Sequence, residues 1–295
     1  MTFNRSFDLM YSKLTVKDFK NLICSELNSI YPLKEILSIY SILLEHRVNI
    51  SKVEAALYPE KVIESHQLLE DLKRLKKAEP VQYVLGIAPF RNLELKVTPD
   101  VLIPRPETEE LVELIIHDPA LNKGDNLQIL DIGTGSGAIA IALKHEFPEA
   151  DLYATDFSIQ ALQVAKANAE KYNLEIHWIH HDILKDPIED LPQSVDIVVS
   201  NPPYVPESNI PLLHPNVTQY EPQSALFVPN HDPLLFYKKI IEIGSIILKP
   251  NGKLFFETFE EFQKSMKQAF KGFKYEDIQL HNDLNGKFRF LIASK

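Results

Sequence analysis

The sequence predicts an α/β protein with a Rossmann-like, mostly parallel seven-stranded sheet whose last strand is antiparallel, preceded by a small all-α domain. From about residue 127, apolar strand-like runs alternate with amphipathic helical stretches, as in parallel sheets covered by helices. Residues 1–78 contain no glycine and show only helical patterns. The 295 residues are 45% hydrophobic, which is enough to build a sizeable core.

The expected strands are short apolar runs, each followed by a turn signal. They cover residues 128–132, 152–156, 176–180, 195–200, 253–258 and 287–293, with a weaker one near 275–280. Helices are expected at residues 138–146, 159–172 and 233–248. Because only residues 281–286 separate the last two strands, this pair is predicted to be antiparallel.

The chain divides into three parts by composition. Apolar residues at helical spacing predict a helical bundle over residues 1–78. A composition rich in strand formers, with alternation in 93–97, predicts a β-hairpin linker over residues 79–99. The alternating strands and helices, which begin with a helix opened by Pro106, predict a second domain over residues 100–295.

The charge balance argues against a protein that coats nucleic-acid phosphates. The formal net charge is −10 and the pI is about 5.5. Residues 1–78 carry 12 Lys and Arg against 10 Asp and Glu, whereas residues 79–295 carry 19 against 31. We therefore expect no direct nucleic-acid binding.

The sequence also favours a cytoplasmic protein, which we expect to be a monomer. The one cysteine, Cys24, excludes an internal disulfide and suits a reducing cytosol. The first 13 residues do not resemble a signal peptide, and no segment approaches the roughly 20 apolar residues of a membrane helix. The ten histidines include the pair His180–His181, but they show no metal-ligand spacing, so no metal is expected.

A glycine-rich turn follows the first strand of the second domain. In ILDIGTGSGAIAIAL, residues 129–143, the strand ends at Asp131 and three glycines lead into a helix: Gly133, Gly135 and Gly137. Glycines let a ligand approach the backbone closely. The Gly-x-Gly-x-Gly spacing is not the dinucleotide fingerprint, and the preceding acid suits a cationic ligand. The alternative is a turn that only packs the helix on the strand.

Acidic residues end the next two strands. Asp156 lies 25 residues after Asp131, where a carboxylate can accept the hydroxyls of a bound ribose. Its alternative role is a helix N-cap, which Ser158 can fill instead. Asp182, after the third strand, could accept from an adenine amino group, with Ile183 against the ring.

The fourth strand is followed by SNPPYVP, residues 200–206. Taken alone, Asn-Pro-Pro indicates only the end of a strand and a loop. Here it completes an ordered series at the carboxyl ends of successive strands. The series resembles the class I S-adenosyl-L-methionine-dependent methyltransferases, in which Asn-Pro-Pro-Tyr occurs in enzymes that methylate planar nitrogens. The resemblance implies S-adenosyl-L-methionine as methyl donor and S-adenosyl-L-homocysteine as product.

This tetrapeptide suits methylation of an amide or exocyclic amino nitrogen, whose lone pair is delocalised. The Asn201 side-chain oxygen and the Pro202 carbonyl can each accept one N–H of an NH₂ group, which fixes the nitrogen for in-line transfer. Proline rigidity holds the carbonyl, and Tyr204 offers a ring face to the planar group. No strong general base is needed, because the proton becomes acidic as the new bond forms.

Further stretches resemble the release factor glutamine methyltransferases. They are PVQYVLG (80–86), VLIPRPETEELVE (101–113), ILDIGTGSGAIAIAL, SNPPYVP, YEPQSALF (220–227) and DLNGKFRF (283–290), in order over about residues 80–293. Arg-Pro-Glu-Thr-Glu is the most specific of them. The resemblance implies methyl transfer to the side-chain nitrogen (N5) of the glutamine in the Gly-Gly-Gln motif of class I peptide chain release factors. These factors would be the partners, and the modification would modulate translation termination.

The same resemblance implies the site residues. The methyl donor would be held by Asp131, Gly133, Thr134, Gly135, Ser136, Gly137, Asp156, Asp182, Ile183 and Asn201. The substrate glutamine would be held by Asn201, Pro202, Pro203 and Tyr204. The wall by which the tripeptide enters would be shaped by Arg105, Glu107 and Glu109, although acids in a first helical turn also balance the helix dipole. Because residues 1–78 are predicted to fold separately and have a nearly neutral charge balance, we also expect them to dock the release factor.

Four positions depart from the family pattern. Asn92 replaces a glycine, Ile183 stands where some members have an aromatic residue, residues 230–233 replace a glycine-rich segment, and Thr258-Phe259 replaces Ile-Gly. These changes concern loops and affinity more than the transfer reaction. Two other functions remain open: an N6-adenine methyltransferase of DNA or RNA that uses the same tetrapeptide, and a non-catalytic cofactor-binding scaffold.

Overall fold

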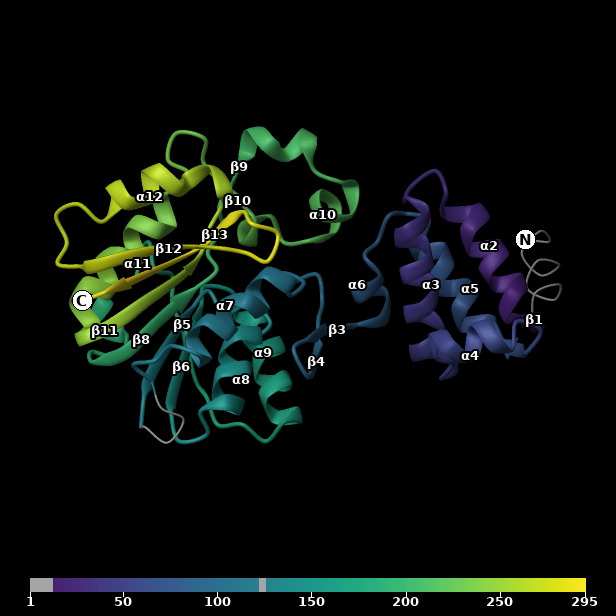
Figure 1. The fold of residues 1–295 in the computed structure, drawn as a ribbon, viewed down its shortest axis with the longest axis horizontal. Coiled ribbons are helices and arrows are strands. Elements are labelled where there is room, and N and C mark those ends of the chain that lie inside the picture. Colours follow the sequence, from purple (N-terminus) through teal and green to yellow (C-terminus); the bar gives the residue numbers. More distant parts are fainter. Residues whose placement is uncertain (1–12, 122–125) are drawn as a thin grey trace. The chain divides into compact units, whose positions relative to one another are not determined.

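The computed structural model describes residues 13–121 and 126–295. The described residues form two compact units (Figure 1), one made of residues 13–86 with 215–220 and the other of residues 87–121, 126–214 and 221–295. The second unit holds a seven-stranded sheet, and the first is mainly helical. No helix in the described ranges is both long enough and apolar enough to span a membrane.

The sheet of the second unit has the strand order β12-β13-β11-β8-β5-β6-β7. Its strands are β5 (Gln128–Ile132), β6 (Asp151–Asp156), β7 (His177–His180), β8 (Val195–Ser200), β11 (Leu248–Glu257), β12 (Glu276–Asn282) and β13 (Phe288–Ser294). β13 is antiparallel to both of its neighbours, and the pairs from β11 through β7 are parallel. The predicted fold class is confirmed.

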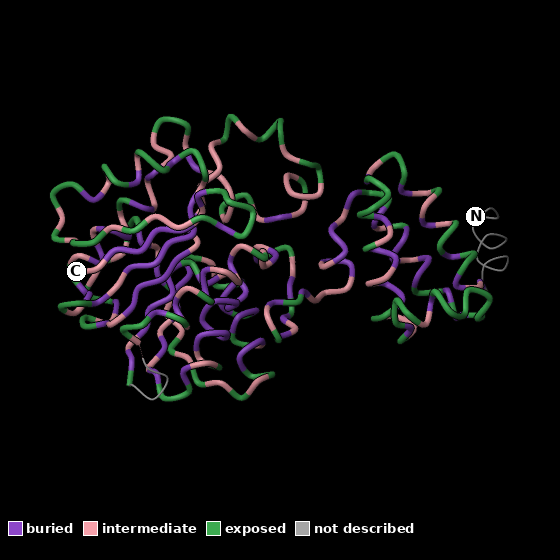
Figure 2. The backbone as a smooth tube through the Cα atoms, in the orientation of Figure 1, coloured by how far each residue is buried: buried purple, intermediate pink, exposed green. Residues whose placement is uncertain are grey.

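Helices pack against both faces of this sheet. They are α7 (Pro106–Ile116), α8 (Ala138–Glu146), α9 (Ile159–Lys171), α11 (Leu235–Ile247) and α12 (Gln263–Ala269). Consecutive strand residues point to opposite faces. Ile129 and Phe255 lie in one apolar cluster with side chains of α7 and α8, whereas Leu130 and Phe256 lie in another with those of α11 and α12. Burial on both faces explains why these strands are nearly continuous apolar runs (Figure 2).

Two helix starts follow from local sequence. α7 has Pro106 in its first turn, together with Glu107 and Glu109. The negative charges of these two acids interact favourably with the positive end of the helix dipole. α9 is capped by Ser158, whose hydroxyl oxygen accepts a hydrogen bond from the Ala161 N–H at 3.1 Å. The predicted alternative cap is therefore confirmed.

The segment before the sheet contains a helix as well as a hairpin. β3 (Ile87–Phe90) and β4 (Leu93–Lys96) pair in antiparallel fashion, and α6 (Val81–Leu85) precedes them. A composition rich in strand formers predicts no helix there. α6 is only one turn long and ends at Gly86, whose φ of +77° is in the left-handed region that glycine adopts readily.

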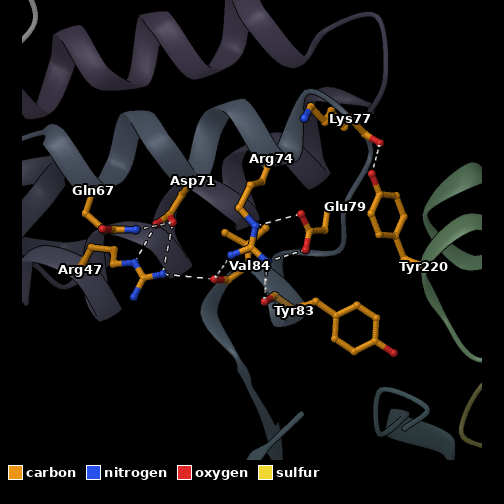
Figure 3. Close-up of polar contacts among 9 residues, drawn as sticks. All are labelled: Arg47, Gln67, Asp71, Arg74, Lys77, Glu79, Tyr83, Val84 and Tyr220. Atoms are coloured by element: carbon orange, nitrogen blue, oxygen red, sulfur yellow. Dashed lines mark hydrogen bonds and ion pairs between the residues drawn. The ribbon is translucent and has the colours of Figure 1, made fainter. Parts of the chain in front are cut away.

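An insertion lies between β8 and α11. It contains β9 (Val205–Pro206), α10 (Pro215–Tyr220) and β10 (Phe227–Val228), and its two strands pair in parallel. α10 belongs to the first unit. The Tyr220 hydroxyl donates a hydrogen bond to the Lys77 carbonyl at 2.8 Å (Figure 3).

The first unit is built from six helices and two short strands among its described residues. Besides α6 they are β1 (Lys13–Thr15), α2 (Val16–Leu27), α3 (Leu33–Val48), α4 (Lys52–Leu57), β2 (Val62–Glu64) and α5 (His66–Leu75), and α10 adds a late segment of the chain. The core includes Phe19, Ile23, Ile36, Leu43, Leu68 and Leu72. The sequence analysis predicts helices only, because a three-residue strand is too short to show a period of two.

A buried ion pair joins α3 to α5 (Figure 3). Arg47 donates to both carboxylate oxygens of Asp71, at 2.7 Å from Nε and 3.2 Å from a terminal nitrogen. Gln67 donates to the same carboxylate at 3.1 Å. Both Arg47 and Arg74 donate to the Val84 carbonyl of α6, at 3.2 and 2.9 Å. The Asp71 side chain has no exposed surface, so its charge depends on these donors.

Replacing Asp71 with alanine should lower the free energy of unfolding by about 3 kcal/mol, because Arg47 loses its partner in a largely buried site. Urea unfolding followed by far-UV circular dichroism would measure this loss. Trp178, the only tryptophan, lies in β7 and would report the second unit separately. As a control, Glu60→Ala removes an exposed pair with Lys17 and should cost less than about 1 kcal/mol. Equal losses for the two variants would contradict the prediction.

Candidate active site

The loops that carry the glycine-rich turn, Asp156 and Asn-Pro-Pro-Tyr begin at one edge of the sheet. In the parallel register, Ile132 of β5 lies beside Thr155 of β6 and Ser200 of β8. The loops that follow these three strands therefore start side by side. The Ser200 hydroxyl strengthens this edge by donating to the Ile132 carbonyl at 2.7 Å.

The glycine-rich turn after β5 wraps over the end of β6. The N–H groups of Gly133 and Thr134 both donate to the Thr155 carbonyl at 2.9 Å. The Gly135 N–H donates to the Asp156 carboxylate, also at 2.9 Å. A Cβ built on Gly135 would meet no atom within 4 Å, so open space lies beside this backbone. Such space allows the close approach of a ligand.

Gly137 has a different reason to be glycine. Its φ is +82°, and a Cβ there would lie 3.0 Å from the Ile141 side chain and 3.1 Å from that of Ala165. Gly137 therefore permits close packing of α8 against α9. The alternative role predicted for a glycine turn, packing of a helix, applies to this one position.

Asn168 of α9 fastens the glycine turn to the β3–β4 hairpin. Its side-chain nitrogen donates to the carbonyls of Ser136 and Lys96, both at 2.9 Å, and its oxygen accepts from the Lys96 N–H at 2.6 Å. The side chain is buried and all its hydrogen bonds go to backbone atoms. A single Asn inside a helical pattern carries no sequence signal for this role.

Asp131 is a buried acid with an unused oxygen. Its Oδ2 accepts from the Thr134 hydroxyl at 2.6 Å, whereas its Oδ1 has no partner among the described residues. Burial raises the pKa of Asp131 to about 7. A buried acceptor without a partner beside open backbone suits a ligand that donates hydrogen bonds.

Asp156 lies at the end of β6 and also holds the glycine-rich turn in place. Its two carboxylate oxygens accept from the N–H groups of Gly135 and Ser158, both at 2.9 Å. Burial raises the pKa of Asp156. The next residue, Phe157, leaves 52% of its surface exposed, which is unusual for a large aromatic side chain. The sequence analysis did not select Phe157, although an aromatic residue after a strand-end acid is a visible signal.

In the loop after β7, Asp182 makes polar contacts within the loop, whereas Ile183 is buried in the core. Asp182 accepts from the Leu184 N–H at 3.0 Å and pairs with Lys185 at 2.6 Å, and this second contact lowers its pKa. Ile183 is buried in the core cluster on the α11 side of the sheet.

The Asn-Pro-Pro-Tyr segment after β8 faces α7 and the end of β11. The Asn201 side-chain nitrogen donates to the Thr108 hydroxyl oxygen at 3.1 Å, and the Thr108 hydroxyl donates to the Glu257 carboxylate at 2.6 Å. The Tyr204 hydroxyl lies 3.4 Å from the other Glu257 oxygen. Neither the Asn201 Oδ1 nor the Pro202 carbonyl accepts a hydrogen bond within the described ranges. Two acceptors are thus available at the end of β8.

A ring contact and burial also shape this part of the site. The Tyr204 ring lies nearly parallel to that of Phe259, with centroids 6.0 Å apart and planes 15° apart. Burial raises the pKa of Glu257 to about 7. Pro202 is buried and Pro203 is partly exposed, so the segment is anchored on one side.

Arg105 is held by an acid from the insertion. It pairs with Glu221 at 2.5 Å, and Glu221 also accepts from the Ile103 N–H at 3.2 Å. Glu107 and Glu109 are partly exposed in the first turn of α7. Three residues that the sequence analysis did not select contact predicted ones: Thr108, Glu221 and Glu257. Thr108 and Glu221 lie inside quoted motifs, and Glu257 ends its strand as Asp156 does.

Comparisons with known proteins give the family of the chain. Residues 25–86 match the family described as PrmC N-terminal domain, and residues 113–214 match that described as Methyltransferase small domain. A release factor glutamine methyltransferase of Flavobacterium psychrophilum is 40% identical over 282 residues, which cover 94% of this chain and 98% of the relative. The chain belongs to the release factor glutamine methyltransferase family. The predicted family and enzyme class are confirmed.

Further similarities support the same family and fold. A release factor glutamine methyltransferase of Bacteroides thetaiotaomicron is 37% identical over 277 residues, 92% of this chain and 98% of the relative. A solved structure described as the delta-N METTL16 MTase domain superposes with a TM-score of 0.50 at 18% identity, over 69% of this chain and 88% of that chain. At that identity the structural likeness shows the shared methyltransferase fold alone. Within the described residues of this methyltransferase, no cluster of three His, Cys, Asp or Glu could hold a metal ion.

The two glycines of the turn should respond differently to an added methyl group. Gly135→Ala should lower the free energy of unfolding by about 1 to 2 kcal/mol, the cost of a left-handed backbone at a non-glycine residue. Gly137→Ala should cost about 1 to 3 kcal/mol more, because its methyl group also overpacks against Ile141 and Ala165. Urea unfolding followed by Trp178 fluorescence would compare them, and equal losses would contradict the packing role of Gly137.

Proposed function

We propose that this methyltransferase transfers a methyl group from S-adenosyl-L-methionine to the side-chain amide nitrogen of the glutamine in the Gly-Gly-Gln motif of class I release factors. Family membership supports the class of substrate. The observation that carries the proposal is the pair of unused acceptors, the Asn201 Oδ1 and the Pro202 carbonyl, at the carboxyl end of β8. A primary amide offers two N–H donors, which match two acceptors.

The residues at the strand ends fit the proposed methyl donor. The unpaired Oδ1 of Asp131 could accept from its ammonium group, and the open space beside Gly133 and Gly135 leaves room for its chain. The residues that would hold the donor are Asp131, Gly133, Thr134, Gly135, Ser136, Gly137, Asp156, Asp182, Ile183 and Asn201. The exposed ring of Phe157 is a further candidate for contact with the adenine. When bound, the donor supplies an electrophilic methyl group on a sulfonium.

The protein's own part in the reaction is to orient the amide. Asn201 and Pro202 would each accept one amide N–H, which turns the nitrogen lone pair toward the donor and favours positive charge developing on nitrogen. Tyr204 has one face against Phe259 and would present the other to the planar amide. Pro203 would help to hold the segment rigid. Arg105, Glu107 and Glu109 would shape the wall by which the substrate loop enters.

Mass spectrometry of a purified class I release factor tests this proposal. Incubation with the enzyme and S-adenosyl-L-methionine should add one methyl group to the Gly-Gly-Gln peptide. Asn201→Ala should slow the reaction by about 10²- to 10³-fold, because one of two acceptors is lost. Asn92→Ala, in the exposed β3–β4 turn, serves as a matched control and should retain the wild-type rate within about twofold. Transfer to DNA or RNA instead would overturn the proposal in favour of the adenine alternative.

We also propose that residues 1–78 dock the body of the release factor. The supporting observation is a group of large apolar side chains in and near α4 that leave 59–69% of their surface exposed: Val53, Leu57, Tyr58 and Val62. Leu57 and Tyr58 line a surface hollow together with residues 59–61. Exposed apolar side chains grouped in this way are typical of protein-binding surfaces.

Substitution of Leu57 and Tyr58 with serine should raise the KM for the whole release factor by about tenfold. It should leave methylation of a short Gly-Gly-Gln peptide unchanged, because the peptide has no body to dock. Ile246→Ser, at an exposed apolar position of α11, is the control and should change neither value. Equal loss with peptide and whole factor, or no loss with either, would contradict docking through this surface.

A further inference from the structure

Three side chains from separate elements form a hydrogen-bonded series beside the transfer segment. Asn201 follows β8, Thr108 lies in the first turn of α7, and Glu257 ends β11. The two contacts measure 3.1 Å from Asn201 to Thr108 and 2.6 Å from Thr108 to Glu257. Thr108 and Glu257 are both buried, with 5% and 1% of their surface exposed. Water therefore does not replace these partners.

The chemistry of the three groups decides which of them donates and which accepts in each hydrogen bond of the series. An ionised carboxylate only accepts hydrogen bonds, and a threonine hydroxyl has a single proton to donate. The Thr108 hydroxyl must donate its one proton to Glu257. Its oxygen can therefore only accept a hydrogen bond from Asn201. Asn201 must then turn its NH₂ group toward Thr108. Its carbonyl oxygen is left on the opposite side of the amide.

We propose that Thr108 and Glu257 are positioning residues that hold the Asn201 amide with its oxygen, and not its nitrogen, toward the substrate. The inference rests on the proposed function, in which that oxygen accepts an N–H of the substrate amide. In the reversed orientation two NH₂ groups would face each other, and the substrate nitrogen would lose one of its two acceptors. An asparagine amide is nearly symmetric in shape, so packing alone does not select between the two orientations.

Charged and polar groups around Glu257 agree with an acceptor there. The Tyr204 hydroxyl directs a second donor at the carboxylate, and the charge of Arg289 in β13 favours the ionised form. Glu107 on α7 and burial oppose it. The Tyr237 hydroxyl of α11 donates to the Glu257 backbone carbonyl at 3.0 Å, and among the described residues it makes no hydrogen bond to the Glu257 carboxylate. Protonation of Glu257 would turn it into a donor and allow the series to reverse.

Variants of Thr108 test the proposal by turnover of a release factor at saturating S-adenosyl-L-methionine. Thr108→Val keeps the shape but removes the hydroxyl, and should lower kcat by about 10- to 100-fold. Thr108→Ser restores the hydroxyl and should recover kcat to within about threefold of wild type. The dissociation constant for S-adenosyl-L-methionine, measured by calorimetry, should stay within about twofold in both variants, which also verifies that they are folded. Loss of kcat in Thr108→Ser equal to that in Thr108→Val would overturn the proposal.

A double-mutant cycle separates positioning from general support. In an Asn201→Ala background, under single-turnover conditions, Thr108→Val should cause no further loss, because the amide it orients is absent. An additional loss of tenfold or more would show an independent structural role and overturn the proposal. Tyr237→Phe changes the same buried region without touching the carboxylate, and should keep kcat within about threefold.

The pH profile gives an independent readout. Burial raises the pKa of Glu257 to about 7, so kcat of the wild type should fall up to tenfold per unit as the pH drops below 7. Glu257→Gln, whose side chain does not titrate and whose amide oxygen can still accept from Thr108, should lack this acidic limb. An acidic limb of equal depth in Glu257→Gln would show that another group causes it, and would overturn the role given to Glu257. Absence of release factor methylation by the wild type would refute the proposed function itself, and is distinguishable from these outcomes.

Discussion

The parallel pairing of β5 with β6 and β8 decides where the functional side chains of this methyltransferase lie. Parallel strands in register end at one edge, and the residues just after them start at the same height. Apolar side chains on both faces hold this register, because a slip by one residue would exchange the two clusters that contain Ile129 and Leu130. The site is thus positioned by the core beneath it, and its loops need only modest contacts of their own.

Two buried carboxyl groups, one in β5 and one at the end of β11, have different surroundings. Asp131 has one oxygen without a partner among the described residues, whereas both oxygens of Glu257 face hydroxyl groups. Burial raises the pKa of each to about 7. The difference in partners separates their roles: an acid with a free acceptor suits a ligand, and an acid with its donors already present suits the orientation of a neighbour.

Much of the second unit is predictable from sequence, because its strands are apolar runs long enough to show a pattern and its glycine turn has a distinctive spacing. The short elements β1, β2 and α6 are not predictable in this way, since three to five residues show no period. The contact of Thr108 with Glu257 spans 149 residues and depends on how α7 packs against the sheet. Asp156 illustrates a subtler limit: its position is predictable, but its hydrogen bond to Gly135 depends on the path of the turn.

The buried state of Asp131 makes ligand capture a proton-linked event. With a pKa of about 7, this carboxyl is partly protonated in a neutral solution, and a protonated carboxyl has no negative charge with which to attract a positively charged amine. Capture of a cation at Asp131 must therefore release a proton to the surrounding buffer. By thermodynamic linkage the apparent affinity for such a ligand weakens as the medium becomes more acidic. An enzyme of this design would sense the acidity of its surroundings through its affinity for a cationic ligand.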